Sequence, residues 1–353
     1  MRAMIAMSGG VDSSVAAYLT QQDGLNCIGA TAQMCGPDVL GNAYSEQSIH
    51  DAKAVATRLG MDFHILDATD AFRQNVVEDF IRCYEDGLTP NPCIQCNKHI
   101  KFSYLLDKAL ELGCDCIVTG HYAKIRRDEN TGRYLLYKAA DESKDQSYFL
   151  ACLNQHQLSH ARFPLGEYTK AEIREIAEKQ GFLNAKKRDS QDICFIPDGD
   201  YKAFICRYTG KAYPTGDYLD LQGNVVGKHA GAIGYTLGQR KGLGIALGAP
   251  VYVCSKDMAA NTVTVGPEEA LFTATLHAKD WNWLPFPNLT EPMRVMAKAR
   301  YRHIPQPATV YPAEDGNAKV VFDQPQRAIT PGQTVVLYDE DMVVGSGIIT
   351  ETY

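Results

Sequence analysis

The stretch Met4-Ile5-Ala6-Met7-Ser8-Gly9-Gly10-Val11-Asp12-Ser13-Ser14 decides the fold of this chain. Its apolar first part predicts a buried strand, and the residues after Ser14 predict a helix. A glycine-rich turn between a strand and a helix presents backbone N–H groups at the positive end of the helix dipole. Such a turn is typical of a site that binds a phosphate group.

The residues around the two glycines indicate which phosphate is bound. No lysine follows them, so the stretch is not the loop G-x-x-x-x-G-K-[ST] that steers a terminal phosphate. Ser8, Ser13 and Ser14 offer hydroxyl groups, and Asp12 suits a magnesium ion on the phosphates. We therefore interpret the loop as one that holds a pyrophosphate leaving group. The alternative is an ordinary glycine-containing turn between a strand and a helix.

The composition is that of an ordinary globular protein. The chain has 353 residues, 45% of them apolar and 22% charged, which is enough for two or three domains. The net charge of −7 argues against a protein coated by nucleic acid along its length. No apolar run is long enough to span a membrane, and the N-terminus enters a strand at once, so we expect no membrane span and a cytoplasmic location.

Alternating strand and helix patterns predict an α/β fold with a doubly wound, mostly parallel sheet in residues 1–207. From about Tyr208, helical periodicity gives way to β-branched runs, with a hairpin signal at Gly223-Asn224. We expect a small β-rich central domain over residues 208–272 and a C-terminal β-barrel over residues 273–353. Ligands of parallel sheets bind beyond the carboxyl ends of the strands, which places the glycine loop, the segment after Ala32 and Gly120-His121 around one crevice.

Eleven cysteines, an odd number, favour free thiols, metal ligands or catalytic sulfur over a disulfide framework. Cys93 and Cys96 form a Cys-x-x-Cys pair in a proline-stiffened loop before a helix expected to begin at Asn97. A thiol at a helix N-terminus has a lowered pKa, and Lys98 would lower the pKa of Cys96 further. This favours a reactive thiolate, with a structural zinc half-site as the alternative.

A third cysteine lies in the stretch Asp189-Ser190-Gln191-Asp192-Ile193-Cys194-Phe195-Ile196-Pro197. Between Ile193 and Phe195, the Cys194 side chain by itself is typical of a buried core cysteine. This stretch indicates a function only when it is considered together with the other sequence motifs of the chain.

Six motifs occur in an order that resembles the tRNA-specific 2-thiouridylases, a family of ATP pyrophosphatases with a PP-loop. The resemblance runs essentially from end to end and extends to Lys298–Arg302 and Thr330–Gln333. The six motifs are Ser8–Ser14, Asn91–Phe102, Thr119–Ala123, Lys144–Leu150, Asp189–Ile196 and Gly238–Gly244.

The resemblance implies an enzyme that uses ATP and Mg²⁺ to adenylate O2 of the wobble uridine, position 34, of a tRNA. A cysteine persulfide then replaces the activated oxygen, which releases AMP and leaves 2-thiouridine. By position, Cys194 corresponds to the persulfide carrier, and Cys96 to the nucleophile that attacks the persulfide or closes a disulfide with Cys194. Asp12 is expected to act in adenylation. A sulfur-relay protein or a cysteine desulfurase is the implied sulfur source.

The binding residues of the family carry over by position. ATP is expected at Ala6, Met7, Ser8, Gly9, Gly10, Val11, Asp12, Ser13, Ala32 and Gly120. The anticodon loop and stem of the tRNA are expected at Asn91, Pro92, Cys93, His121, Lys144, Asp145, Gln146, Arg300, Tyr301 and Gln333. The first three of these would meet the target base.

One position departs from the family pattern, because many members carry an aspartate where this chain has Cys93. Cys93, Cys96 and Cys194 could instead hold a [4Fe–4S] cluster with one open iron, as related tRNA thiolases with a Cys-x-x-Cys pair do. Two further alternatives are a PP-loop ligase acting on small molecules and a metal- or RNA-binding module without catalysis.

Overall fold

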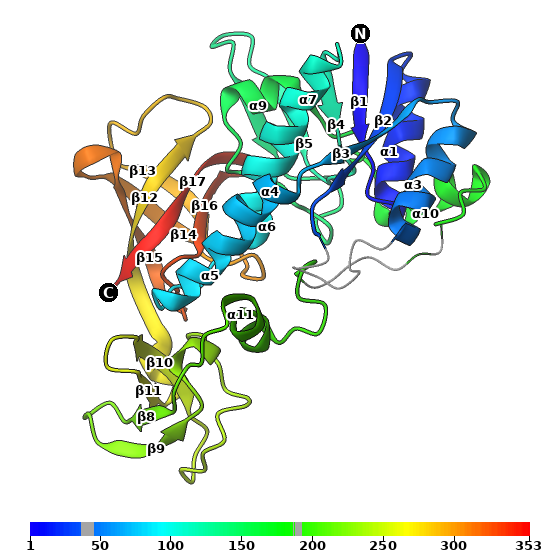
Figure 1. Cartoon of the computed structure of the whole chain (residues 1–353). Coiled ribbons are helices and arrows are strands. Elements are labelled where there is room, and N and C mark those ends of the chain that lie inside the picture. The colour runs from blue at the N-terminus through cyan, green and yellow to red at the C-terminus, as the bar shows by residue number, and fades with distance from the viewer. Residues whose placement is uncertain (37–45, 186, 188–192) are drawn as a thin grey trace.

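The computed structural model describes residues 1–36, 46–185, 187 and 193–353 (Figure 1). Three bodies are visible: a parallel sheet wrapped by helices, a β-barrel beside it, and a smaller β-rich lobe below both. This confirms the predicted fold class. The part of the Cys194 motif at residues 189–192 lies outside the described residues.

The N-terminal sheet has the strand order β3-β2-β1-β4-β7, and all neighbouring strands are parallel. Its strands are β1 (Arg2–Ala6), β2 (Asn26–Gln33), β3 (Phe63–Asp67), β4 (Cys116–Val118) and β7 (Ala161–Arg162). Side chains alternate along β1, so Ala3 and Ile5 enter one apolar cluster while Met4 enters the other. Both faces of the sheet are therefore covered, as the alternation of strands and helices predicts.

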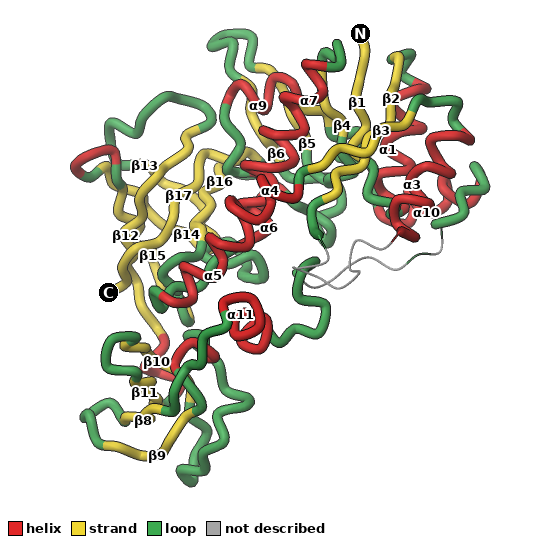
Figure 2. The backbone as a smooth tube through the Cα atoms, viewed as in Figure 1, coloured by secondary structure: helices red, strands yellow, loops and turns green. Residues whose placement is uncertain are grey.

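Helices occupy both faces (Figure 2). The helices from the N-terminus to the start of the central lobe are α1 (Val11–Gln22), α3 (Glu46–Arg58), α4 (Thr69–Phe72), η1 (Arg73–Val77), α5 (Glu78–Glu85), α6 (Pro92–Gln95), η2 (Cys96–Tyr104), α7 (Leu105–Glu111), α8 (Ser147–Leu150), α9 (Gln155–His160), α10 (Lys170–Lys179) and α11 (Tyr201–Thr209). Buried residues of α1, α3 and α10 share one cluster, and those of α4, α5, η2 and α7 share the other. Thr169 and Glu172 form a capping box at the start of α10.

The central lobe is a four-stranded sheet with the order β10-β11-β8-β9. Its elements are β8 (Gly216–Leu219), β9 (Val225–His229), η3 (Ala232–Gly234), β10 (Tyr252–Asp257), β11 (Thr262–Gly266) and η4 (Glu268–Leu271). The hairpin predicted at Gly223-Asn224 is confirmed, because β8 and β9 pair in antiparallel fashion on either side of it. Gly223 has a φ of 86°, the left-handed conformation that glycine adopts without strain.

The C-terminal body is a closed antiparallel barrel with the order β12-β15-β14-β13-β16-β17, sealed by pairing of β12 with β17. Its elements are β12 (Phe272–Trp283), β13 (Met293–Lys298), β14 (Gln306–Pro312), η5 (Glu314–Gly316), β15 (Ala318–Arg327), β16 (Thr334–Asp339) and β17 (Met342–Thr352). A hairpin of β5 (Lys124–Arg127) and β6 (Tyr134–Tyr137) joins β17 and fastens the barrel to the N-terminal domain. Within the described ranges, no helix is both long and apolar enough to span a membrane.

Candidate active site

The glycine loop connects β1 to α1 at the carboxyl edge of the parallel sheet, where sequence analysis places the phosphate site. Gly9 has a φ of 73°, and a Cβ there would collide with the carbonyl oxygen of Ser48, so only glycine fits. The Ser13 hydroxyl donates to the carbonyl of Gly10 at 3.1 Å and lies 3.2 Å from the backbone nitrogen of Ser8, whose N–H it accepts. These internal bonds fix the conformation of the loop.

Asp12 lies in the first turn of α1 and has two partners that sequence analysis did not identify. Its carboxylate accepts hydrogen bonds from the Tyr122 hydroxyl at 2.9 Å and from the Lys170 ammonium at 2.8 and 2.9 Å. Mg²⁺ is usually held by one or two carboxylates together with substrate phosphates. One carboxylate at the phosphate loop fits that role, although Lys170 contacts both of its oxygens here.

Gly120, after β4, brings a second strand end against the loop. A Cβ at this position would lie 2.7 Å from the backbone carbon of Asp12 and 2.7 Å from the backbone nitrogen of Ser13. The chain can approach α1 this closely only with glycine. Ala32, the other expected adenosine contact, is 5% exposed near the end of β2 on the same sheet edge.

The environment of Cys96 differs from the sequence prediction. The helix begins at Pro92, capped by the Asn91 side chain, because proline fits the first helical position. Cys96 is therefore inside a continuous helix, at the start of its π-helical part η2, and it is buried. Burial raises its pKa to about 11, so the predicted lowering of that pKa by the helix N-terminus is wrong.

Cys93 and Cys194 are exposed, in contrast to Cys96. The alternative of a buried core cysteine at position 194 is wrong, because the core contact is made by its neighbour Phe195, whose ring packs 5.3 Å from that of Phe80. Desolvation by the surrounding protein, followed by Cys96 and Cys93, still raises the pKa of Cys194 to about 12. Cys96 and Cys93 therefore lie close enough to Cys194 to affect its pKa.

Lys101, rather than Lys98, is the cation near these thiols. Its positive charge acts to lower the pKa of Cys93, Cys96 and Cys194, against the larger effect of desolvation. A π-helix joins residues five apart, which places positions 96 and 101 on one side of the helix. Lys98 instead acts on Cys152.

His121 joins the thiol region to the nucleotide loop. Its Nε2 lies 3.3 Å from the Lys101 ammonium and its Nδ1 lies 2.7 Å from the Thr119 hydroxyl. Burial, and then the charge of Lys101, hold the pKa of His121 well below its usual value, so the ring is neutral near pH 7. With 7% exposure, His121 is buried between Lys101 and Thr119 rather than at the surface.

Cys35 is a fourth thiol at this edge, and sequence analysis did not identify it. It follows β2 and packs, half-buried, against the cluster that holds Cys96 and Phe195. The adjacent Met34 sulfur lies 3.9 Å from the Cys96 sulfur. Burial first, then Cys194 and Cys96, raise the pKa of Cys35.

All eleven cysteines lie among the described residues, and all are free thiols. Across the described part of the chain, no three His, Cys, Asp or Glu side chains are placed to hold a metal ion. A [4Fe–4S] cluster would bind each cysteine through a separate iron atom, so the alternative of a cluster on Cys93, Cys96 and Cys194 stays a prediction.

Three of the residues expected to bind tRNA hold the site together. The Gln333 amide donates to the carbonyls of Thr89 and Pro90 at 2.9 and 3.1 Å and so fixes the segment before Asn91. The Asp145 carboxylate accepts from the backbone nitrogens of Ala139 and Ser147. The Gln146 side chain accepts from the backbone nitrogen of Tyr122, the residue that contacts Asp12.

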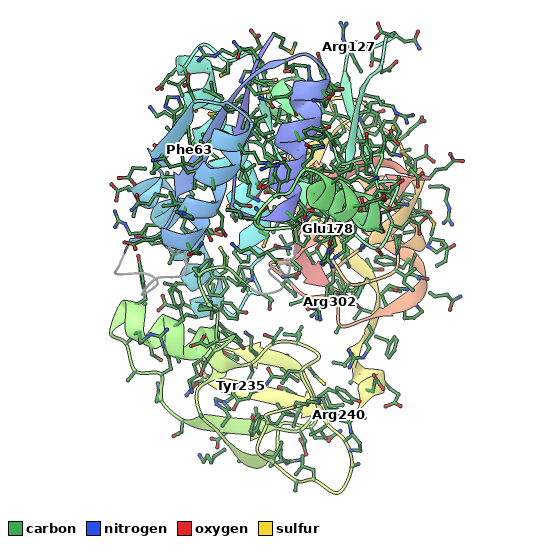
Figure 3. All side chains as sticks on the ribbon, turned by 90° about the vertical axis from the view of Figure 1, so that its right-hand side faces the viewer. Phe63, Arg127, Glu178, Tyr235, Arg240 and Arg302 are labelled. Carbon is green, nitrogen blue, oxygen red and sulfur yellow. The ribbon has the colours of Figure 1, made fainter. Side chains whose placement is uncertain are left out.

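Arg300 and Tyr301 follow β13 at the junction between the barrel and the rest of the molecule. The Arg300 guanidinium donates to the carbonyl of Leu237 at 3.1 Å and to the Thr330 hydroxyl, and burial lowers its pKa. The Tyr301 ring lies 4.3 Å from that of Phe149. Figure 3 labels the next basic residue, Arg302, above the central lobe that carries Tyr235 and Arg240.

Two open cavities lie in the central part of the chain. One is lined by Asp198–Lys202, Gly234, Tyr235 and Gly242, and the other by Arg240 and Gly242–Val251. None of the site residues predicted from the sequence lines either cavity.

Three family models match the chain and follow its three bodies. The tRNA methyl transferase HUP domain matches residues 1–198, the tRNA methyl transferase PRC-barrel domain residues 202–267, and the Aminomethyltransferase beta-barrel domain residues 273–349. The fold and the loop thus define a protein in which a HUP domain is followed by a PRC-barrel domain and a β-barrel.

Relatives that align over nearly their whole length define the family more narrowly than the three domain models do. A tRNA-specific 2-thiouridylase MnmA from Clostridioides difficile is 47% identical over 99% of this chain and 98% of its own length. Those from Clostridium acetobutylicum and Acetivibrio thermocellus are 49% and 48% identical, each over 99% of both chains. The chain belongs to the tRNA-specific 2-thiouridylase MnmA family.

The solved structures that match this chain are less similar to it in sequence than these relatives are. The U34-tRNA thiolase NcsA from Methanococcus maripaludis with its [4Fe-4S] cluster has a TM-score of 0.35 and 18% identity, over 60% of this chain and 70% of that chain. This similarity is too low to bear on function.

Proposed function

We propose that this chain is an ATP-dependent tRNA sulfurtransferase that converts the wobble uridine of tRNA to 2-thiouridine. ATP adenylates O2 of the uridine and releases pyrophosphate. Sulfur from a cysteine persulfide then replaces the activated oxygen at C2, and AMP leaves. The names of the full-length relatives support the activity. The geometry supports separate roles for the phosphate loop in adenylation and for the cysteines in sulfur transfer.

The observation that carries the proposal is that the phosphate loop and the thiols meet at one sheet edge. Gly120 lies directly against Asp12 and Ser13 of the loop. The next residue, His121, contacts Lys101, and the charge of Lys101 reaches Cys96 and Cys194. An adenylated base held in this crevice would be close to both reaction partners, which is the main requirement for a two-step reaction at one carbon atom.

The two cysteines have environments suited to different tasks. Cys194 is exposed, so a sulfur-donor protein can load it with a persulfide. Cys96 is buried beside Met34, out of reach of such a donor. When the Cys96 thiolate attacks the carrier sulfur, the Cys194–persulfide bond breaks, hydrosulfide leaves with the electron pair, and a Cys96–Cys194 disulfide forms. The hydrosulfide is the nucleophile for C2 of the adenylated uridine.

We favour the persulfide route over the cluster route, because Cys194 is exposed and Cys96 is buried, as suits a carrier thiol and an internal nucleophile. For adenylation, the loop from Ala6 to Ser13 holds the phosphates and Asp12 would hold Mg²⁺. The metal would neutralise charge on the departing pyrophosphate. Asn91, Pro92 and Cys93 begin the helix that carries Cys96, which is a suitable place for a flipped-out target base.

Incubation with ATP, Mg²⁺, a persulfide donor and unmodified tRNA, followed by nucleoside mass spectrometry, tests the proposal. We expect 2-thiouridine from the native chain and none from Cys194→Ser or Cys96→Ser. Cys83→Ser is the matched control, because Cys83 is half-buried in α5 and should leave the yield unchanged. Normal thiolation by Cys96→Ser or Cys194→Ser would refute the proposed roles.

A further inference from the structure

Lys170 is a cation held where its surroundings oppose a positive charge. It is the first residue of α10 and is only 8% exposed. The N-terminus of a helix carries partial positive charge, so a lysine there is disfavoured by the helix dipole. Removal of its charge from water adds a further penalty. Neither helix formation nor packing explains a lysine at this position.

The compensation for this charge comes from the nucleotide loop. The Lys170 ammonium contacts both oxygens of the Asp12 carboxylate, at 2.8 and 2.9 Å, and lies 5.8 Å from the centre of the Tyr122 ring. Asp12 is in the first turn of α1, so the starts of two helices converge on one ion pair. The pair joins positions 158 residues apart and therefore depends entirely on the tertiary fold.

The loop itself has no lysine, although the pyrophosphate part of ATP carries several negative charges. Lys187 also reaches the loop, with its ammonium 3.2 Å from the carbonyl of Gly9, but it is exposed and paired with Asp51 at 2.9 Å. Lys170 is buried behind the loop and next to the residue that would take Mg²⁺. A buried ammonium contributes more to anion binding than an exposed one, because water screens it less.

We propose that Lys170 is the phosphate-binding cation that the glycine loop lacks. Its ammonium pairs with the Asp12 carboxylate in the structure. When ATP binds, it pairs with the β- and γ-phosphates and leaves the Asp12 oxygens available to Mg²⁺. This inference rests on the proposed function, since it takes ATP as the nucleotide.

The test compares pyrophosphate with AMP, the two parts into which ATP is divided. Each is titrated by calorimetry, in the presence of Mg²⁺, into the full native chain, Lys170→Met and Lys170→Arg. We expect Lys170→Met to weaken pyrophosphate binding by about 10- to 100-fold, the range for loss of a hydrogen bond to a charged group, and to leave AMP binding unchanged. Lys170→Arg should recover most of the affinity, because it keeps the charge.

Lys179→Met is the matched control, since Lys179 is an exposed lysine in the last turn of α10 that pairs with Glu175. It should bind both ligands as the native chain does. Unchanged pyrophosphate affinity in Lys170→Met, or an equal loss for AMP and pyrophosphate, would overturn the inference. The second result would mean that Lys170 only maintains the shape of the loop.

A second comparison covers the case in which Lys170→Met leaves Asp12 unpaired and the chain unfolds. In an Asp12→Asn background titrated without Mg²⁺, no carboxylate needs the lysine and no metal has to be held, and Lys170→Met should still lower pyrophosphate affinity. No further loss in that background would show that Lys170 acts only through Asp12, against the inference. These binding measurements do not involve sulfur, so a failure of the native chain to form 2-thiouridine would count against the proposed function alone.

Discussion

The charge of Lys101 bears on three thiols whose surroundings otherwise favour the neutral form. Burial raises the pKa of Cys96 to about 11, and the ammonium opposes that shift. Since only the thiolate attacks sulfur, a small fraction of the protein is reactive at neutral pH. We therefore expect the rate of sulfur transfer to depend on Lys101, which lies five positions after Cys96 in a π-helix.

The first prediction concerns pH. We expect the single-turnover rate of sulfur transfer to rise with pH from 7 to 10, because the Cys96 thiolate becomes more populated as the pH approaches its pKa. Lys101→Met should raise that pKa and reduce the rate at neutral pH by roughly tenfold. Rapid-quench assays with preformed adenylated tRNA measure this step.

Lys98→Met is the control, because Lys98 is exposed and acts on Cys152 rather than on Cys96. A rate that does not change between pH 7 and 9 in the native chain would contradict the role given to Cys96. Identical pH dependence of the sulfur-transfer rate in Lys101→Met and Lys98→Met would contradict the role given to Lys101.

The second prediction concerns Gly120. Gly120→Ala places a methyl group 2.7 Å from backbone atoms of Asp12 and Ser13, so the loop must shift. We expect ATP binding, measured by calorimetry, to weaken by roughly tenfold to hundredfold, because small displacements of binding groups have effects of this size. Gly36→Ala is the comparison, since its added carbon meets only the Thr69 side chain at an ordinary 3.6 Å. Native affinity in Gly120→Ala would show that the close approach is unimportant.

Among the elements, the helix from Pro92 to Glu111 shows where sequence reasoning succeeds and where it fails. The motif and the helix after it are both predictable from the sequence. The start of the helix is not, because Asn91 acts as the cap and Pro92 as the first residue, five positions before the expected start. That shift moves Cys96 from a helix end to a buried helical turn, which reverses the direction of its pKa change.

The segment after β13 gives a third prediction, in which two neighbouring arginines behave differently. Arg300 bonds to Leu237 and Thr330 inside the molecule, whereas Arg302 is exposed. Arg300→Ala should lower the thermal midpoint by about 2–4 °C for each kcal/mol lost, because it removes buried hydrogen bonds. Scanning calorimetry measures this change.

Arg302→Ala should leave the midpoint unchanged and reduce the slope of log affinity for tRNA against log salt by about 1, as expected for one lost phosphate contact. An unchanged slope for Arg302→Ala would show that this arginine does not contact the tRNA. A native midpoint for Arg300→Ala would show that its internal bonds contribute little.

For the molecule as a whole, the free energy of unfolding should fall as the pH rises into the alkaline range. Burial raises the pKa of Cys27, Cys83 and Cys96 to about 11 and that of Cys152 to about 12. In the unfolded chain these thiols lose protons near pH 8.5. The stabilisation from keeping them protonated is complete below that pH and is lost as the pH rises through about 11 to 12.

We therefore predict a steady fall in the urea midpoint between pH 9 and 11. The double variant Cys27→Ala, Cys152→Ala should lose less stability over that interval than the native chain, whatever its stability at pH 7. A midpoint independent of pH over this interval would contradict the buried protonated state of these thiols.

The order of the three bodies, the phosphate loop and the two cysteine motifs are predictable because each depends on local patterns. Lys170, Lys101 and Cys35 are not, because their importance comes from contacts made in the folded chain. Lys170 reaches Asp12 across 158 positions. Cys35 is affected by Cys96 only because its neighbour Met34, after β2, contacts Cys96 in the folded chain. Gln333 and Asp145 were expected at the tRNA, and the structure gives both of them internal hydrogen bonds.

The central claim is that one edge of the parallel sheet carries two separable steps, adenylation at the loop and sulfur transfer at the thiols. Exchange of radiolabelled pyrophosphate into ATP, measured with unmodified tRNA and without a sulfur donor, tests it most directly. We predict native exchange in Cys194→Ser, which has lost its carrier sulfur, and no exchange in Asp12→Ala. Loss of exchange in Cys194→Ser, or its persistence in Asp12→Ala, would contradict the claim.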